Sequence, residues 1–305
     1  MKFTRLSRYE AGWFAPALRA IAKENGYSNV FNPSIAFLDG TWHLAFRAQA
    51  RPGEKPFRSY YANGSAGKLS KPIDLTQILQ DLGTPQVADP KLVPLAGRIY
   101  ITFNTGHSAH SPNGLYLMQV WPQIGVPQKC ELDGRQTVEK NWAFYMPPHG
   151  TLSAIYSLEP LTQLRLVQGQ LDDGKSLHFE RIMSAASNTI SQSLSIGTQM
   201  AFVDSGTAYM VAHEKPRLRS KRGYLGRIVR LDFDSAGAAA ITVGSKRLIH
   251  SFAKLILMGQ RHNPNLLWAV YFPGIVVDGN DVLLSYGIND LEFAFAEIPL
   301  DTIWP

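Results

Sequence analysis

Four segments of this chain share one pattern: a run of β-forming residues, a turn that contains glycine, and a second β-forming run. Glycine tolerates the positive φ that tight hairpin turns require, so each segment predicts a β-hairpin. The segments are Ile35–Arg47, Lys91–Asn104, Gln199–His213 and Gly274–Gly287. Their turns contain Asp39-Gly40, Ala96-Gly97, Ser205-Gly206 and Asp278-Gly279.

The four hairpins also resemble one another at both ends. Polar or turn-forming residues lead into each first strand: Asn32-Pro33-Ser34, Ala88-Asp89-Pro90, Gly197-Thr198 and Pro273-Gly274. The second strands carry Trp42, Tyr100, Tyr209 and Tyr286. A fifth unit with the same logic spans Glu139–Pro160, around His149-Gly150.

The units recur at intervals of about 50–75 residues, which is typical of propeller blades. We therefore expect an all-β fold, a single five-bladed β-propeller domain over residues 1–305. Residues 1–30 would form an N-terminal lead-in that closes the propeller. Phe14–Glu24 and Asp74–Leu82 each predict a short helix. A sandwich of two β-sheets is the alternative architecture.

Composition and charge narrow the class of function. Hydrophobic residues make up 45% of the 305 residues and charged residues 18%, as in globular proteins. The net charge of +6 favours anionic partners, but no motif for binding nucleic acid is present. The charge is concentrated in Lys215, Arg217, Arg219, Lys221, Arg222, Arg227 and Arg230. This stretch is either a solvated loop or a loop that contacts phosphate; peripheral contact with a membrane is a further alternative.

The single cysteine, Cys130, excludes an internal disulfide and a cysteine-based zinc site, and we expect it to be a small buried hydrophobic residue. The first residues lack the apolar core of a signal peptide, and Leu266–Val277 is too short to span a bilayer. A cytoplasmic protein is expected. His107 and His110 have no carboxylate in the register of a metal site, so we predict neither metal nor cofactor.

Residues that open the inner strands of a propeller converge at one mouth of its central channel. The candidates there are Asn32, Asp89, Lys91, Lys140, Asn141, Trp142, Thr198, Tyr286 and Asp290, with Arg47 and His213 at the ends of second strands. Together they offer carboxylates, amides, cations and an aromatic face, which suits a polyhydroxylated ligand and also acid chemistry. Asp89 is either a turn residue that caps backbone amides or a general acid whose pKa burial raises.

In order and spacing, these segments resemble the five-bladed propeller clan of β-mannoside phosphorylases (glycoside hydrolase family 130) and related mannosyltransferases. The resemblance runs from about Asn32 to Ile298 and is carried by FNPSIAFLDGTWHLAFR, VADPKLV, EKNWAFY, GTQMAFVDSGTAYMVAHE and GIVVDGNDVLLSYGIND. In that clan a Glu-Asp-Pro-Arg motif holds the catalytic aspartate. The corresponding residues here are Ala88, Asp89, Pro90 and Lys91.

The resemblance implies roles for individual residues. Asp89 would be the general acid of an inverting reaction, protonating the leaving oxygen through a sugar hydroxyl. Arg47 would hold phosphate together with a basic group of the fourth blade, for which Arg217, Arg222 and Arg227 are candidates. His213 would lie near the phosphate or the sugar, and Asn141 and Asp290 would face the sugar. Lys91 departs from the motif, because lysine is a point charge and cannot bind phosphate bidentately as arginine does.

The leading hypothesis is an inverting enzyme that transfers a hexosyl unit, mannosyl or similar, in glycan biosynthesis. Its partners would be a sugar phosphate or sugar nucleotide, or free phosphate, and a glycan acceptor. An arabinanase-like or mannoside-type glycoside hydrolase is the second hypothesis. It requires a second carboxylate about 6.5–9.5 Å from Asp89, with Glu139, Glu214 and Asp290 as candidates. A non-catalytic carbohydrate-binding propeller is the third.

Overall fold

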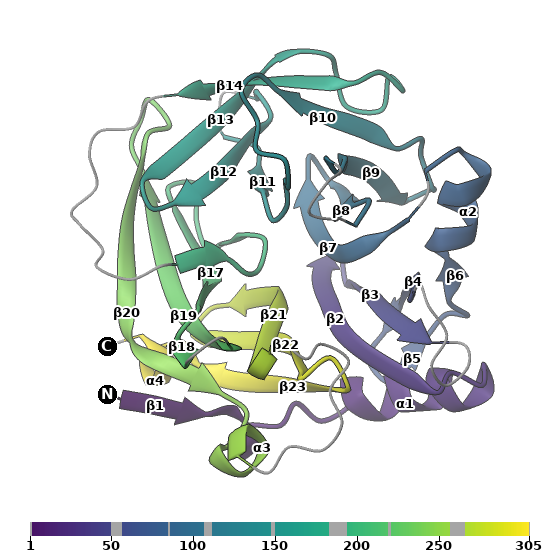
Figure 1. The fold of residues 1–305 in the computed structure, drawn as a ribbon, viewed down its shortest axis with the longest axis vertical. Helices are drawn as coiled ribbons and strands as arrows, with labels where there is room; N and C mark the ends of the chain where they lie inside the picture. The colour runs from purple at the N-terminus through teal and green to yellow at the C-terminus, as the bar shows by residue number, and fades with distance from the viewer. Residues whose placement is uncertain are drawn as a thin grey trace.

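Antiparallel strands make up most of the fold, with short helices beside them (Figure 1). The computed structural model describes residues 2–49, 57–84, 86–106, 112–147, 150–182, 194–218, 221–256 and 266–304. The helices are α1 (Phe14–Glu24), α2 (Leu75–Asp81), α3 (Phe252–Ile256), α4 (Leu300–Ile303) and the 3-10 turn η1 (Leu6–Arg8). The two helices predicted from the sequence are confirmed as α1 and α2. Asp74 caps α2, because its side chain accepts a hydrogen bond from the Gln77 amide.

Successive strands form meanders in chain order. The first contains β2 (Asn29–Leu38), β3 (Thr41–Gln49), β4 (Arg58–Ser65), β5 (Lys68–Leu69) and β6 (Ile73–Asp74). The second contains β7 (Ala88–Leu95), β8 (Arg98–Asn104), β9 (Leu115–Trp121) and β10 (Gln128–Leu132), and the third β11 (Ala143–Tyr145), β12 (Ser153–Leu158), β13 (Leu161–Gln168) and β14 (Leu177–Ile182).

The C-terminal half continues the same arrangement. The next group contains β15 (Leu194–Ile196), β16 (Ala201–Phe202), β17 (Thr207–Glu214), β18 (Arg217–Leu218), β19 (Lys221–Phe233) and β20 (Ala239–Ile249). The last contains β21 (Leu266–Asp278), β22 (Asp281–Ile288) and β23 (Glu292–Pro299). Parallel pairing of β10 with β14 and of β19 with β21 joins neighbouring groups. The N-terminal strand β1 (Lys2–Arg5) pairs in parallel with β20.

The groups surround a common centre instead of stacking as two layers (Figure 1). The all-β, propeller-like fold is therefore confirmed, while the number of five blades stays a prediction. The predicted hairpins are present as β2–β3, β7–β8, β16–β17 and β21–β22. His149, in the turn of the fifth predicted unit, lies outside the described residues.

The inner strands break at prolines, and these breaks position the site. The ladder of β2 shifts between Phe31 and Ser34, that of β7 between Ala88 and Lys91, and that of β21 between Tyr271 and Gly274. Each skipped pair contains a proline: Pro33, Pro90 or Pro273. Proline has no N–H to donate to the ladder, and an irregularity of this kind re-aims neighbouring side chains.

Buried contacts tie the inner strands together around the centre. The Ser34 hydroxyl donates to the Pro273 carbonyl at 3.0 Å and accepts from the Leu92 amide at 2.9 Å, so it links β2, β21 and β7. Cys130 is buried in a hydrophobic cluster, as predicted. α1 packs Phe14 against Phe295 of β23. Within the described ranges, the chain forms no helix of the length and apolarity that crossing a membrane requires.

Candidate functional site

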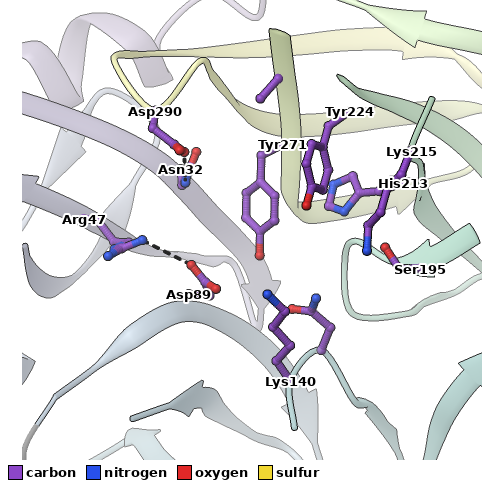
Figure 2. Close-up of a pocket in the computed structure, with 12 residues that line it drawn as sticks. Asn32, Arg47, Asp89, Lys140, Ser195, His213, Lys215, Tyr224, Tyr271 and Asp290 are labelled. Atoms are coloured by element: carbon purple, nitrogen blue, oxygen red, sulfur yellow. Dashed lines mark hydrogen bonds and ion pairs between the residues drawn. The ribbon is translucent and has the colours of Figure 1, made fainter. Parts of the chain in front are cut away.

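A cavity of about 170 Å³ lies where the irregular segments of β2, β7 and β21 converge (Figure 2). It contains seven of the residues predicted from the sequence: Asn32, Arg47, Asp89, Lys140, Asn141, His213 and Asp290. It also contains Ser195, Lys215, Tyr224, Ala269 and Tyr271. Residues from all the strand groups thus meet at one place, as a propeller channel requires.

Asp89 and Arg47 form an ion pair on one side of the cavity. Arg47 Nη1 lies 3.1 Å from Asp89 Oδ1, and a quarter of the Asp89 side chain remains exposed. The Arg47 guanidinium lies 5.1 Å from the ring centroids of both Phe31 and Phe57, which pack edge to face against each other. Contacts with this aromatic pair hold the cation in place beside the carboxylate.

The charge around Asp89 corrects one expectation. Burial alone would raise the pKa of Asp89, but the positive charges of Arg47, Lys140 and Lys91 outweigh it and hold the pKa below its usual value. In the unliganded protein Asp89 is therefore ionised at neutral pH. The sequence suggested a raised pKa for the general-acid alternative, because spacing along the chain does not show that three cations converge on this carboxylate.

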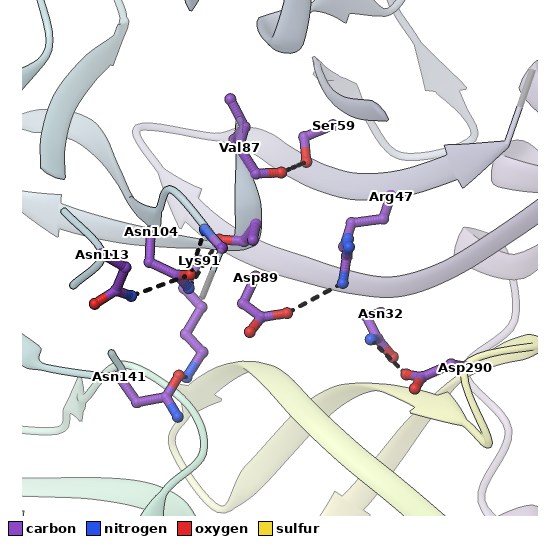
Figure 3. Close-up of polar contacts among 12 residues, drawn as sticks. Asn32, Arg47, Ser59, Val87, Asp89, Lys91, Asn104, Asn113, Asn141 and Asp290 are labelled. Atoms are coloured by element: carbon purple, nitrogen blue, oxygen red, sulfur yellow. Dashed lines mark hydrogen bonds and ion pairs between the residues drawn. The ribbon is translucent and has the colours of Figure 1, made fainter. Parts of the chain in front are cut away.

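Lys91 lies behind the cavity wall and points away from solvent. The residue is 1% exposed, and its Nζ donates to Asn141 Oδ1 at 2.7 Å (Figure 3). Its ammonium also lies 5.6 Å from the centroid of the Tyr271 ring. The pKa of Lys91 is lowered to about 7, chiefly by burial and also by the charges of Lys140 and Lys215, against the opposing effect of Asp89. Lys91 thus contacts two residues that line the cavity, Asn141 and Tyr271, and contributes a positive charge next to it.

The loop that carries Lys140 and Asn141 is held from below by buried polar groups. Glu139 exchanges backbone hydrogen bonds with the Asn113 side chain, both at 2.7 Å. The Glu139 carboxylate accepts from the Trp142 indole N–H at 3.0 Å. Trp142 is 1% exposed and packs in the core, so its ring is not available for stacking on a sugar. Both residues support the loop, and neither lines the Asp89 cavity.

Asn32 and Asp290 form the wall next to Arg47. Asn32 Nδ2 donates to Asp290 Oδ1 at 3.0 Å (Figure 3). Gly287 makes this approach possible, because a Cβ at that position would lie 1.7 Å from Asn32 Oδ1. Any side chain at position 287 would collide with Asn32, which explains the glycine of the Ser285-Tyr286-Gly287 segment.

His213 is a neutral part of the opposite wall. Its Nε2 accepts a hydrogen bond from the Phe272 amide at 2.9 Å, which places the ring proton on Nδ1. Burial lowers the pKa of His213 well below its usual value, and Lys91, Lys215 and Lys140 lower it further. The ring stacks on Tyr271 at 4.8 Å between centroids. His213 therefore offers a hydrogen-bond donor and no charge.

Lys215 follows β17 and faces the cavity beside Tyr224. Its ammonium lies 5.6 Å from the centroid of the Tyr224 ring. The pKa of Lys215 is lowered to about 8, chiefly by burial and also by the charges of Lys140 and Arg222. No ion pair to a carboxylate is found for Lys140 or Lys215 within the described residues.

Two further features indicate that the cavity is built for a ligand. Buried polar atoms without a protein partner include Asn32 Oδ1, Arg47 Nε, Ser195 Oγ and the Tyr271 hydroxyl, all on lining residues. Such atoms cost free energy unless a ligand or water satisfies them. Lining residues with positive φ are Asn32, Asp89, Asn141 and Asp290. Backbone strain in residues other than glycine concentrates at functional sites.

The other predicted residues lie elsewhere. The Thr198 hydroxyl accepts from the Val211 amide in the interior, and the Tyr286 hydroxyl pairs with His250. Arg227 is bound to Glu214 and to the Gly244 carbonyl. Arg217 and Arg222 lie on the β18–β19 hairpin and do not line the cavity, although the charge of Arg222 acts on Lys215.

Four lining residues were missed as site candidates: Ser195, Tyr224, Ala269 and Tyr271. Asn32 and Asp89 stand directly before their prolines, but Tyr271 lies two residues before Pro273, so the proline pattern points to Phe272 and not to Tyr271. The other three carry no such signal in the sequence either. Lys215 was recognised only as part of the basic stretch.

Among the described residues, no three His, Cys, Asp or Glu side chains are grouped so that they could hold a metal ion. His107 and His110 lie outside the described residues.

No family model matches the sequence, and no curated protein does. Solved structures do match. A β-1,2-mannobiose phosphorylase from Listeria innocua is 11% identical with a TM-score of 0.57, covering 90% of each chain. A GDP-mannose-dependent mannosyltransferase from Leishmania mexicana is 13% identical with a TM-score of 0.57, covering 89% of this chain and 85% of the other.

A third match comes from work on the GH130 family of mannoside phosphorylases, which contains hydrolases of β-1,2-mannosidic linkages. It is 15% identical with a TM-score of 0.55 and covers 90% of this chain and 85% of the other. At these identities the likeness concerns the fold, and it agrees with the resemblance seen in the ordered sequence segments. The chain has the fold of the GH130-like propeller clan.

Proposed function

We propose that this chain is an inverting, mannoside-acting enzyme on a single five-bladed propeller domain, and that it uses phosphate or a phosphorylated sugar as co-substrate. Asp89 is the proton-transferring residue. Lys140 and Lys215 bind the phosphate group, and Arg47 adds positive charge beside Asp89. Asn32, Asn141, His213, Tyr271 and Asp290 orient the sugar.

The observation that carries this proposal is the excess of cationic over carboxylate side chains at one cavity. Arg47, Lys140 and Lys215 line the cavity together with Asp89 and Asp290, and Lys91 adds a charge from behind. Arg47 is paired with Asp89, but Lys140 and Lys215 have no carboxylate partner among the described residues, and such cations in a confined site favour an anionic ligand. The neighbours of similar fold include a phosphorylase and a mannosyltransferase by name, which supports the same class of reaction.

The lowered pKa of Asp89 fits this role once the anion is included. A bound phosphate offsets the field of Arg47, Lys140 and Lys215, so the pKa of Asp89 rises when the co-substrate enters. In the direction of phosphorolysis, a phosphate oxygen forms a bond to the anomeric carbon while the glycosidic C–O bond breaks. The proton of Asp89 goes to the leaving oxygen. Synthesis is the reverse, with Asp89 accepting the proton of the acceptor hydroxyl.

The test combines ligand binding with turnover of Asp89→Asn. Thermal shift measured with inorganic phosphate, mannose 1-phosphate, GDP-mannose and neutral mannosides should show stabilisation by the anions. The wild-type protein should either cleave a β-mannoside in the presence of phosphate or transfer mannose from a phosphorylated donor to a mannoside acceptor. Asp89→Asn should reduce turnover by about 10²–10⁴-fold while anion binding persists. If neutral sugars raise the melting temperature and none of the anions does, the phosphate-dependent reaction is excluded.

A glycoside hydrolase is the second candidate function, because a second carboxylate, Asp290, lines the cavity that contains Asp89. Of the three carboxylates proposed as partners of Asp89, it alone lines the same cavity, whereas Glu139 and Glu214 are bound to other groups. A hydrolase that uses Asp290 as base would release mannose without phosphate and lose that activity in Asp290→Asn. A phosphate-dependent enzyme would require phosphate or a phosphorylated donor. A binding protein would show no turnover in either assay.

A further inference from the structure

A second cavity, of about 200 Å³, adjoins the one that contains Asp89. Lys140, Asn141, Ser195 and Lys215 line both. Beyond them the second cavity is walled by residues before β11, at the end of β12 and on β15. These include Gln136, Val138, Tyr156, Ser157, Leu194 and Ile196.

The boundary between the two cavities is cationic. Lys140 and Lys215 both lie there; the charge of Lys140 lowers the pKa of Lys215, and both charges lower the pKa of Lys91. Ser195 Oγ, buried and without a partner in the protein, lies at the same boundary. Figure 2 shows Lys215 and Ser195 on the side of the cavity away from Arg47.

Beyond the shared Lys140 and Lys215, the second cavity has no cation among its described lining residues. Its carboxylate, Glu139, is already committed: Oε1 accepts from the Gln136 amide and the Tyr156 hydroxyl, and Oε2 accepts from Trp142. The remaining wall is a mixture of apolar side chains, Val138, Leu194 and Ile196, and neutral polar ones, Gln136 and Ser157. This chemistry suits an uncharged group that has both an apolar face and hydrogen-bonding edges.

A ligand that fills both cavities must therefore carry its negative charge in the middle and uncharged groups at both ends. We infer that the substrate is a nucleoside diphosphate sugar. Its sugar lies beside Asp89, its phosphates lie at Lys140, Lys215 and Ser195, and its nucleoside occupies the second cavity. This inference rests on the proposed function and selects transfer from a sugar nucleotide over use of free phosphate.

The test compares ligands that differ by one part. Dissociation constants are measured for inorganic phosphate, mannose 1-phosphate and a panel of nucleoside diphosphate sugars that includes GDP-mannose and UDP-glucose. At least one sugar nucleotide should bind about tenfold or more tightly than mannose 1-phosphate, because its nucleoside adds contacts in the second cavity. Val138→Phe narrows that cavity and should remove about tenfold or more of this affinity while leaving phosphate binding within about twofold.

Two further variants control for misfolding. Leu194→Phe narrows the second cavity from β15 and should act as Val138→Phe does. Val126→Phe makes the same change at a residue that is 56% exposed and lines neither cavity, so binding of every ligand should be unchanged. Retained phosphate binding shows that a variant is folded.

The outcomes separate the two claims. If phosphate and mannose 1-phosphate bind but no sugar nucleotide binds more tightly, the inference is overturned and the proposed function stands. If a sugar nucleotide binds tightly and neither narrowing variant weakens it, the nucleoside lies elsewhere and the inference is again overturned. If no anion binds at all, both the inference and the proposed function fail.

Discussion

Two groups of buried charges lie close together along β17 and its continuation, and they differ in how they are neutralised. Glu214 binds Arg227 at 3.0 Å and Arg247 at 2.8 Å, and Arg227 also donates to the Gly244 carbonyl. One residue further on, Lys215 faces the cavity with no carboxylate partner in the described part of the chain. The first group is completed by the protein, while the second requires a ligand to complete it.

The basic residues of this stretch therefore include two kinds: those paired with carboxylates of the protein and those that face the cavity without such a partner among the described residues. Arg227 and Arg230 are bound to Glu214 and Asp232 and contribute to the sheet. Lys215 keeps a lowered pKa because burial and other cations oppose its charge. Charges that the protein satisfies stabilise the fold, and charges left unsatisfied lower its stability until an anion binds.

The largest expected effect is on stability at the completed group. Glu214→Gln leaves Arg227 and Arg247 buried without their carboxylate, and the free energy of unfolding should fall by about 3–5 kcal/mol. Urea denaturation measures this. Glu180→Gln breaks the exposed pair with Arg165 and should cost less than about 1 kcal/mol. Equal losses in the two variants would show that the Glu214 group is not a structural centre.

The next largest effect is on ligand binding and not on stability, at the cavity lysines that have no carboxylate partner in the described ranges. Lys140→Met and Lys215→Met remove hydrogen bonds to a charged ligand, worth about 1.5–3 kcal/mol, and should weaken phosphate binding by about tenfold to a hundredfold. The free energy of unfolding should not fall, because each variant relieves repulsion among cations. Calorimetric titration and urea denaturation check the two effects. Lys68→Met, at an exposed lysine on β5, is the control and should change neither.

A third prediction concerns pH. The pKa of Lys91 is about 7 in the folded protein and 10.5 in its ordinary state, so between these values the unfolded chain binds more protons. Stability should therefore rise with pH above about 7, by at most about 1.4 kcal/mol per pH unit from Lys91. Lys215 adds to the rise above about 8.

Melting temperatures of wild type and Lys91→Met from pH 7 to 9 measure the contribution of Lys91. The variant should show a shallower rise, because it lacks the group that the unfolded chain protonates. An identical pH dependence in both proteins would mean that Lys91 keeps its ordinary pKa when folded. Added phosphate should reduce the rise in wild type, because the anion favours the protonated form of Lys91.

The same residues show what could be predicted from the sequence. The hairpins followed from the turn glycines, and the convergence of Asn32, Asp89 and Asn141 followed from the repeated strand starts. These inferences depend on local patterns and on the symmetry of a repeating fold. The direction of the Asp89 pKa shift and the burial of Trp142 depend on how separate strands pack, which spacing along one chain does not report.

The smallest predicted effects come from removing one hydroxyl at each of two buried tyrosines. The Tyr271 hydroxyl has no partner in the protein and lies on a residue that lines the cavity, whereas the Tyr286 hydroxyl pairs with His250 at 3.0 Å in the core. Tyr271→Phe should leave the free energy of unfolding unchanged or higher and weaken ligand binding by about 0.5–1.5 kcal/mol. Tyr286→Phe should lower stability by a similar amount and leave binding unchanged. Parallel urea denaturation and calorimetric titration of both variants measure the four quantities. If both lower stability and neither alters binding, the Tyr271 hydroxyl does not face a ligand, and the division between completed and uncompleted groups does not extend to neutral side chains.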